Sequence, residues 1–145
     1  MPRLDAERID LWRRFCLLSA SLQRHIDREL TEEEGLPLSW FDALTAIRAA
    51  GGEMRVHALC AALDEVPSSL SRRLDRMEAD GLVRRRPTPR PDDRRAVTVS
   101  LTAAGRGIWR DANVRYRRLV QQGFAQHLTD TDIAALQRVW GKLGH

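Results

Sequence analysis

The sequence has little cysteine and no long apolar segment. Its two cysteines, Cys16 and Cys60, are too few for a disulfide framework or a four-cysteine zinc site. No apolar run approaches the roughly 20 residues that cross a bilayer. Residues 1–12 mix charges of both signs and lack the apolar core of a secretory signal. We therefore expect a cytoplasmic protein that does not insert into a membrane.

Motifs typical of enzymes and metal sites are also missing. The chain contains no nucleophile elbow, Walker A loop or dinucleotide-binding fingerprint, and no set of nucleophilic or acid–base residues converges in sequence. His57 and Cys60 have a spacing that could face one ion, but no third ligand accompanies them. The sequence thus predicts a protein that is not an enzyme and that holds no metal and no cofactor.

Charge is distributed unevenly along the 145 residues. With 43% apolar and 30% charged residues, the composition suits one globular domain or two small intertwined ones. Residues 1–66 carry a net charge of −4, whereas residues 67–145 carry +8. The excess lies within residues 67–118, which hold 14 arginines against 6 acidic residues. This concentration of arginine indicates a polyanionic partner.

Apolar residues recur at helical spacing through the first part of the chain. This pattern predicts a helix over residues 4–30, a second from Ser39 as N-cap to Gly51, and a third over about 54–62. The apolar stripe of the first helix consists of Leu4, Leu11, Phe15, Leu18, Leu22, Ile26 and Leu30.

Residues 67–80 form the best-defined predicted helix. Pro67 suits its first turn, Ser68 or Ser69 can cap it, and Gly81 ends it. One face is an apolar stripe of Leu70, Leu74 and Met77. The opposite face carries Ser68, Ser69, Arg72, Arg73 and Arg76, with Ser71 alongside.

The pattern after Gly81 predicts a hairpin and two further helices. Residues 82–86 and 96–101 are expected to be strands, joined by a proline-rich turn with an arginine-rich tip. A long helix over about 103–125 is expected to follow Thr102 as its cap, and a last helix to follow Thr129 and Asp130.

Two segments carry recognisable motifs. The first runs from Val66 to Arg85 and reads VPSSLSRRLDRMEADGLVRR. The second has the spacing D-x-R-x5-L-T-x-x-G, which is met by Asp93, Arg95, Leu101, Thr102 and Gly105. On these residues the chain resembles the MarR family of winged helix-turn-helix regulators, in the recognition helix and in the wing.

The resemblance implies a mostly α (α+β) fold with three parts. Residues 38–101 would form the winged helix-turn-helix DNA-binding domain, with its recognition helix at about 67–80 and its wing at about 82–101. Residues 1–37 would form an N-terminal dimerisation helix, and residues 102–145 the C-terminal helices that complete the dimer interface. The alternative is that these terminal helices pack within one monomer.

The polar face of the predicted recognition helix suits contact with DNA. An α-helix fits the major groove, its N-terminus attracts phosphate, and one bidentate arginine–guanine contact discriminates by about 1–3 kcal/mol. Arginines at a hairpin tip suit a narrow minor groove. The residues predicted to contact DNA are Ser68, Ser69, Ser71, Arg72, Arg73, Arg76, Arg90 and Arg94. The alternatives are a solvated helix face paired with Asp75 or Glu78, and a mobile, solvated hairpin tip.

The resemblance also implies roles for other side chains. Asp93 and Arg95 correspond to the family's pair that braces the wing. A small-molecule effector, such as a phenolic acid, would lie near Trp12, Arg14, Leu18, His25 and Trp40, although core packing explains the same residues. Cys16 stands about where some members carry a peroxide-sensing cysteine, but it also reads as a buried, inert thiol.

We therefore predict a homodimeric, sequence-specific transcriptional regulator of the MarR type that binds double-stranded DNA with a pseudo-palindromic operator. A repressor that is released by a small ligand or by thiol oxidation is the expected form. The alternative is a non-specific architectural nucleoid-associated protein, which the basic middle of the chain would serve equally well.

Overall fold

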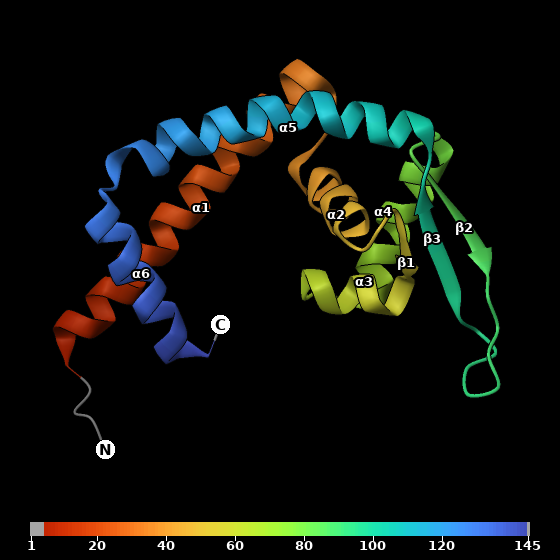
Figure 1. Ribbon diagram of the computed structural model, residues 1–145, viewed down its shortest axis with the longest axis horizontal. Helices are drawn as coiled ribbons and strands as arrows, with labels where there is room; N and C mark the ends of the chain where they lie inside the picture. Colours follow the sequence, from red (N-terminus) through yellow and green to blue (C-terminus); the bar gives the residue numbers. More distant parts are fainter. Residues whose placement is uncertain (1–4, 145) are drawn as a thin grey trace. The chain divides into compact units, whose positions relative to one another are not determined.

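The computed structural model describes residues 5–144 and shows helices together with one small sheet (Figure 1). The elements in chain order are α1 (Ala6–Glu34), α2 (Leu38–Ala49), β1 (Glu53–Arg55), α3 (Val56–Leu63), α4 (Pro67–Ala79), β2 (Val83–Pro87), β3 (Val97–Leu101), α5 (Ala103–Gly123), the 3₁₀ turn η1 (Ala125–His127) and α6 (Asp130–Leu143). The predicted mostly helical fold with a winged helix-turn-helix is confirmed.

The chain divides into two compact units. The first contains the chain up to Ile26 together with the chain from Val114 onward, and the second contains Asp27–Asn113. The long helices α1 and α5 therefore each contribute to both units. Among the described helices, none is long and apolar enough to cross a membrane.

The second unit folds around a core of its own. Its antiparallel sheet has the order β1-β3-β2, with Val99 of β3 opposite Met54 on one side and Arg85 on the other. The largest fully buried side chains are Leu30, Leu36, Phe41, Leu44, Ile47, Leu59, Leu70, Leu74, Met77, Val83 and Val99, and all of them lie in this unit. Burial of each such side chain contributes about 1.5–3 kcal/mol, so the apolar core of this unit is the main favourable term in its folding.

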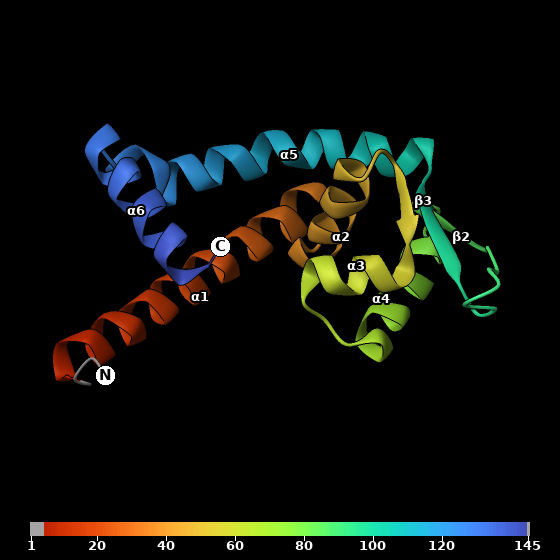
Figure 2. The same ribbon diagram turned by 60° about the horizontal axis from the view of Figure 1, so that its bottom comes forward.

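The helix-turn-helix consists of α3 and α4. Asp64, in the turn between them, has the left-handed conformation with φ +52°, which aspartate tolerates better than most residues. Pro67 occupies the first turn of α4, where its missing N–H has no helical partner to lose. Figures 1 and 2 show the β2–β3 hairpin extending from the sheet as the wing, with its loop at the end away from the start of α5.

The base of the wing is held by the L-T-x-x-G part of the second motif. The Oγ1 of Thr102 donates to the carbonyl groups of Gly81 (2.6 Å) and Leu82 (3.0 Å), and accepts from the N–H of Gly105 (3.0 Å). A Cβ at Gly105 would lie 2.1 Å from the carbonyl oxygen of Leu82. This close backbone approach excludes a side chain and explains the glycine. The prediction that Thr102 caps the following helix is confirmed.

The first unit packs differently. Helices α1 and α5 touch closely at Gly123, where a Cβ would lie 2.5 Å from Cδ1 of Leu22. Thr129 and Asp132 form a reciprocal capping box at the start of α6, as the predicted Thr129 cap requires. Nevertheless α6 has no buried residue. The large apolar side chains that stay exposed in this unit are Leu11, Trp12, Phe15, Leu17, Leu18, Val114, Phe124, Ile133, Val139, Trp140 and Leu143.

The first two predicted helix boundaries need correction. Helix α1 continues to Glu34 instead of ending at residue 30, because the break comes only at Gly35 with φ +65°. Ser39 does not cap α2, which begins at Leu38 after Pro37. Instead, the backbone N–H of Leu38 donates to Oδ1 of Asp27 at 2.8 Å, and Asp27 lies 11 residues earlier in the chain. Leu4, the first residue of the predicted apolar stripe, lies outside the described residues.

Two further expectations about local structure are wrong. Met54 and Arg55, expected in the third helix, belong instead to β1, because their backbone groups pair with β3. Neither Ser68 nor Ser69 caps α4, since both lie inside the helix and its N-cap is Val66, which makes no side-chain cap bond.

Candidate nucleic-acid interface

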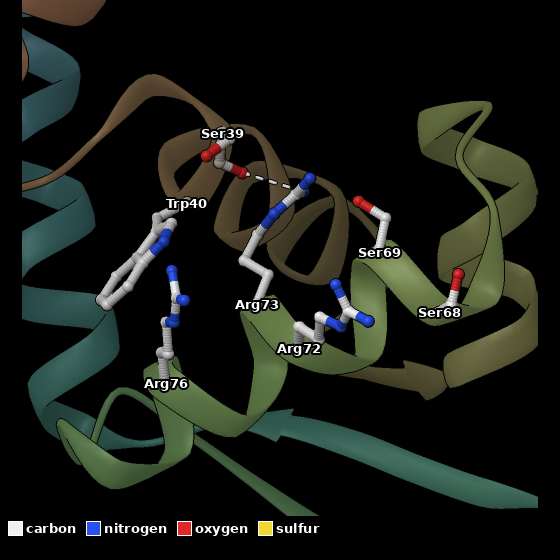
Figure 3. A pocket seen from close by; sticks show the side chains of 7 residues that line it. All are labelled: Ser39, Trp40, Ser68, Ser69, Arg72, Arg73 and Arg76. Carbon is white, nitrogen blue, oxygen red and sulfur yellow. Dashed lines mark hydrogen bonds between the residues drawn. The ribbon is translucent and has the colours of Figure 1, made fainter.

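Helix α4 is amphipathic in the way that a reading helix requires. Leu70, Leu74 and Met77 are fully buried against the rest of the second unit. The other face borders a polar groove of about 350 Å³ beside the first turn of α2 (Figure 3). The residues that line the groove are Ser39, Trp40, Ser68, Ser69, Arg72, Arg73 and Arg76. Five of the six predicted contact residues of α4 are thus brought together on one surface, and Ser71 is not among the lining residues.

Arg72 and Arg76 are exposed and make no ion pair with any residue between 5 and 144. The alternative considered from the sequence was pairing with Asp75 or Glu78 within the helix. Both acidic side chains bind Arg85 of β2 instead, at 2.5 Å and 3.2 Å. The two guanidinium groups are therefore available to an anion outside the protein.

The Arg85 cluster also joins the wing to α4. The backbone N–H of Arg85 donates to Oε2 of Glu78 at 2.7 Å. This hydrogen bond, more than the neighbouring charge of Arg85, holds the pKa of the Glu78 carboxyl below its ordinary value. Glu78 therefore stays ionised and keeps β2 attached to the recognition helix.

Arg73 differs from its neighbours because it is held inside the protein. Its side chain is only 12% exposed, and Nη2 lies 2.5 Å from Oε2 of Glu65. Nη1 donates to the backbone oxygen of Ser39 at 3.2 Å, the contact drawn in Figure 3. Nearby, desolvation raises the pKa of the Asp42 carboxyl, the charge of Arg73 opposes this shift, and the charge of Glu65 adds to it. Arg73 thus ties α4 to the start of α2.

The start of α4 presents free backbone donors to the same groove. The first bond within the helix runs from the N–H of Leu70 to the carbonyl of Val66, at 3.2 Å. The N–H groups of Ser68 and Ser69 precede that bond, so the helix itself gives them no partner. Together with the helix dipole, such groups attract phosphate.

The tip of the wing carries two further exposed arginines. Arg90 and Asp93 exchange two backbone hydrogen bonds of 2.8 Å and 3.0 Å, which close the turn. Oδ1 of Asp93 accepts from the backbone N–H of Arg95 at 3.0 Å, and no ion pair joins these two described side chains. Arg90 and Arg94 are both exposed at this turn.

Comparison with known proteins finds a family that part of the chain matches. Residues 34–96, which run from the end of α1 to the residue before β3, match the sequence model of the MarR family. The resemblance to this family in the sequence motifs is confirmed over this segment. A comparison with curated protein sequences finds no significant match.

Three solved structures illustrate the similarity to MarR-family regulators. Sco3205 from Streptomyces coelicolor, solved in complex with DNA, has a TM-score of 0.86 and 26% identity over 99% of this chain and 89% of its own. A mutant of MarR from Escherichia coli, complexed with operator DNA, has a TM-score of 0.80 and 27% identity over 99% and 100%. The organohalide-sensing regulator RdhR, in its 2,4-dichlorophenol-bound form, has a TM-score of 0.77 and 26% identity over 99% and 84%.

The residues that MarR-family resemblance suggested for an effector are divided between the two units. Trp40 lies in the second unit, in the groove beside α4, where Figure 3 shows Arg76 extending toward it. The other four lie on α1 in the first unit, and they are Trp12, Arg14, Leu18 and His25. Arg14 pairs there with Asp10 at 2.7 Å.

The two cysteines have different surroundings. Cys60 is buried on α3, as its place on the apolar face predicted. Cys16 is exposed on α1, so the expectation of a buried thiol at this position is wrong. Across residues 5–144 there is no group of three His, Cys, Asp or Glu side chains placed to hold a metal ion.

Sequence reasoning missed three residues of this surface. Ser39 and Trp40 reach the groove from α2, and Arg85 organises the acidic side chains behind α4. The position of Trp40, in the first turn of α2 just after Pro37, carried no signal that α4 lies beside it. Arg85 could have been found from strand alternation, which turns it away from Arg84 and Arg86.

Proposed function

We propose that the protein is a dimeric, sequence-specific DNA-binding repressor. The observation that carries this proposal is the polar face of α4, where Arg72 and Arg76 are exposed without ion pairs beside the free N-terminus of the helix. A helix of this kind fits the major groove, and unpaired guanidinium groups can bind guanine or phosphate in a bidentate way.

The arginines of α4 have separate roles in this proposal. Arg72 and Arg76 contact DNA, together with Ser68, Ser69 and Ser71 near the helix start. Arg73 acts as a positioning residue, since its guanidinium is occupied by Glu65 and the carbonyl of Ser39. Trp40, which borders the groove, contacts the sugar–phosphate backbone or a base beside Arg76.

The wing supplies the second contact. Arg90 and Arg94 project from a turn closed by its own backbone bonds, so they enter an adjacent minor groove with little ordering cost. Asp93 braces this turn through the backbone N–H of Arg95. The proposed DNA-binding domain is therefore residues 38–101.

The terminal helices form the dimer in this proposal. The first unit contains an apolar groove of about 790 Å³, lined by Leu11, Trp12, Phe15, Leu136, Val139, Trp140 and Leu143. Most of these side chains are large apolar groups that stay exposed, and a cluster of exposed apolar side chains marks a protein–protein interaction site. A second copy of the chain would cover it, and the two-fold axis would match a pseudo-palindromic operator whose half-sites lie about one DNA turn apart.

Release of DNA by an effector completes the proposal. A small ligand that favours a dimer with mismatched recognition helices would lower DNA affinity. Oxidation of Cys16 would act in the same way, since this thiol is accessible. DNA binding is compared after peroxide treatment of the natural protein and of Cys16→Ser. The variant can no longer be oxidised at this position but can still respond to a ligand, so the comparison separates the two routes.

The test is binding to DNA from upstream of the protein's own gene, against shuffled DNA of equal length, at two salt concentrations. A repressor of this kind binds the natural sequence at least about 1,000-fold more tightly, and salt weakens both complexes. Equal affinity for the two DNAs would contradict the proposal and favour an architectural protein.

A further inference from the structure

A second cluster of arginines lies on the second unit, outside the proposed DNA-binding face. Arg48 at the end of α2 and Arg106 and Arg110 at the start of α5 line a cavity of about 480 Å³. Gly51, Gly52, Leu101 and Trp109 complete its lining, so no acidic residue is among the lining residues. A volume of this size is typical of small-molecule sites.

The arginines of this cavity have no acidic partners. None of the three makes an ion pair with a described residue. The acidic residue nearest in sequence to Gly51 and Gly52 is Glu53. Its carboxylate pairs with a different arginine, since Oε2 lies 3.4 Å from Nη2 of Arg86. Three positive charges that share one cavity repel each other, and a bound anion would relieve that repulsion.

Trp109 positions the first of these arginines. The Cζ of Arg48 lies 4.2 Å from the centroid of the indole ring, and this ring also stacks on Phe41 with centroids 6.2 Å apart. The indole Nε1 donates to Oγ1 of Thr45 at 2.9 Å, which fixes the ring. The guanidinium of Arg48 therefore lies over a fixed aromatic ring at the edge of the cavity.

Glycine makes room for the second arginine. A Cβ at Gly52 would lie 2.8 Å from Nη2 of Arg106, so a side chain there would displace this guanidinium from the turn, and the φ of +101° at Gly52 itself favours glycine. Arg106 also reaches the carbonyl of Leu101 at 3.5 Å. The cavity is thus built from two segments that are far apart in sequence, residues 48–52 and 101–110.

We propose that this cavity binds a small oxyanion, a carboxylate or phosphate group on a compact organic molecule. Guanidinium groups pair with both groups in a bidentate way, and Leu101 and Trp109 offer an apolar wall to the rest of the ligand. The cavity lies at the base end of β3, whereas the DNA-contacting tip of the wing lies at the other end (Figure 1). A small anion fits this position better than a DNA phosphate does.

The position also suggests a regulatory role, and only this step rests on the proposed repressor function. Helix α5 runs from the cavity into the first unit, which carries the proposed dimer surface. An anion that bridges Arg48 of α2 to Arg106 and Arg110 of α5 would stiffen the start of that helix. It would thereby change the affinity of the dimer for its operator.

The binding test uses the whole chain and needs no DNA. Sodium benzoate and inorganic phosphate are titrated separately at constant ionic strength, while NMR follows the indole N–H signal of Trp109, which Trp109→Phe identifies. We expect saturable shifts with at least one probe. The double variant R106Q/R110Q should lower its affinity by about tenfold or more, because charge-assisted hydrogen bonds are lost.

The matched control is R117Q/R118Q, which removes the same charge from exposed positions of the same helix. Its affinity for the probe should match that of the natural protein, and melting by circular dichroism should show that both double variants are folded. No saturable shift with either probe, or equal losses in both double variants, would overturn the proposal.

A measurement of operator affinity tests whether the cavity binds a small anion or a DNA phosphate. Operator affinity of R106Q/R110Q without probe should stay within about twofold of the natural protein, since rim charges away from a contact change binding little. A loss as large as that of R72A/R76A would assign the cavity to a DNA phosphate and overturn the small-anion site. If the probes bind but never change operator affinity, the site stands and its regulatory role is refuted.

Discussion

The two compact units differ in how they bury their apolar side chains. In the second unit the fully buried side chains surround one three-stranded sheet, and Val66 is its only large apolar side chain exposed among the described residues. In the first unit Trp12 is 65% exposed and Leu17 71% exposed, and α6 has no buried residue. The second unit therefore has an apolar core of its own, whereas the first unit leaves much of its apolar surface uncovered.

This contrast assigns separate tasks to the two units. A rigid core holds the groove beside α4 in one geometry, as recognition of a fixed DNA surface requires. Exposed aromatic side chains such as Trp12 and Trp140 resemble the residues that dominate protein–protein interfaces. The predictions below test whether DNA contact and assembly are indeed separable in this way.

The largest expected effect concerns DNA affinity. The double variant R72A/R76A should lose about 2–6 kcal/mol of operator binding, because two arginine contacts at about 1–3 kcal/mol each are removed. Electrophoretic mobility shift or anisotropy titration measures this loss. The control R117A/R118A, on α5 of the first unit, should keep operator affinity, and both variants should keep the oligomeric state of the natural protein. Unchanged DNA affinity in R72A/R76A would show that α4 is not the reading element.

A core substitution should affect the second unit alone. Leu74→Ala should lower the free energy of unfolding by about 2–5 kcal/mol, because it leaves a cavity beneath α4. Urea unfolding at several protein concentrations measures it. The loss should be independent of concentration. A loss that grew as the protein was diluted would mean that the winged-helix core depends on assembly.

The first unit should show the opposite behaviour. Trp140→Ala should weaken dimerisation by about 2 kcal/mol, since exposed aromatic side chains of this kind form interface hot spots. Analytical ultracentrifugation measures the dimer Kd, and the midpoint of thermal unfolding should become more dependent on concentration. A monomeric natural protein, or an unchanged Kd, would contradict the assignment of this surface. Arg138→Ala, exposed on the same helix, is the matched control.

Trp40 tests where the boundary of the DNA surface lies. Trp40→Phe should lower operator affinity by about 1 kcal/mol if the indole contacts a sugar or a base, since stacking on nucleic acid is worth about 1–3 kcal/mol per contact. The salt dependence should stay that of the natural protein, because no charge is removed. Weaker dimerisation in place of weaker DNA binding would move Trp40 to an interface or an effector site.

The smallest effect concerns the attachment of the wing. The pKa of Glu78 is lowered in the folded protein, so its contribution to stability is present above the ordinary pKa of 4.5 and is lost as pH falls through the lower folded value. Glu78→Gln should therefore flatten the loss of stability below pH 4.5. The difference should stay under about 1 kcal/mol, because the side chain is partly exposed and solvent screens it. Thermal unfolding of both proteins from pH 3 to 7 measures it.

Neighbouring residues of the same type can have different contacts that only the folded chain reveals. Arg72 and Arg73 are neighbours of the same type, and sequence reasoning assigned both to DNA contact. Glu65 and the carbonyl of Ser39 withdraw Arg73 from the surface, and neither partner is marked in the sequence. The cap of α2 was misassigned for a similar reason. The oxygen that accepts from the N–H of Leu38 at the start of α2 belongs to Asp27 on the preceding helix.

The sequence by itself determined the features that depend on residues close together in the chain. The apolar stripe of α4, the Thr102 and Thr129 caps and the alternation in β3 are local, because helix and strand periods repeat within a few residues. Only the tertiary structure decided which arginines remain free, that Trp40 borders α4, that β1 pairs with β3, and that Arg48 meets Arg106 and Arg110. These depend on contacts between segments far apart in the chain, and a linear pattern does not record such contacts.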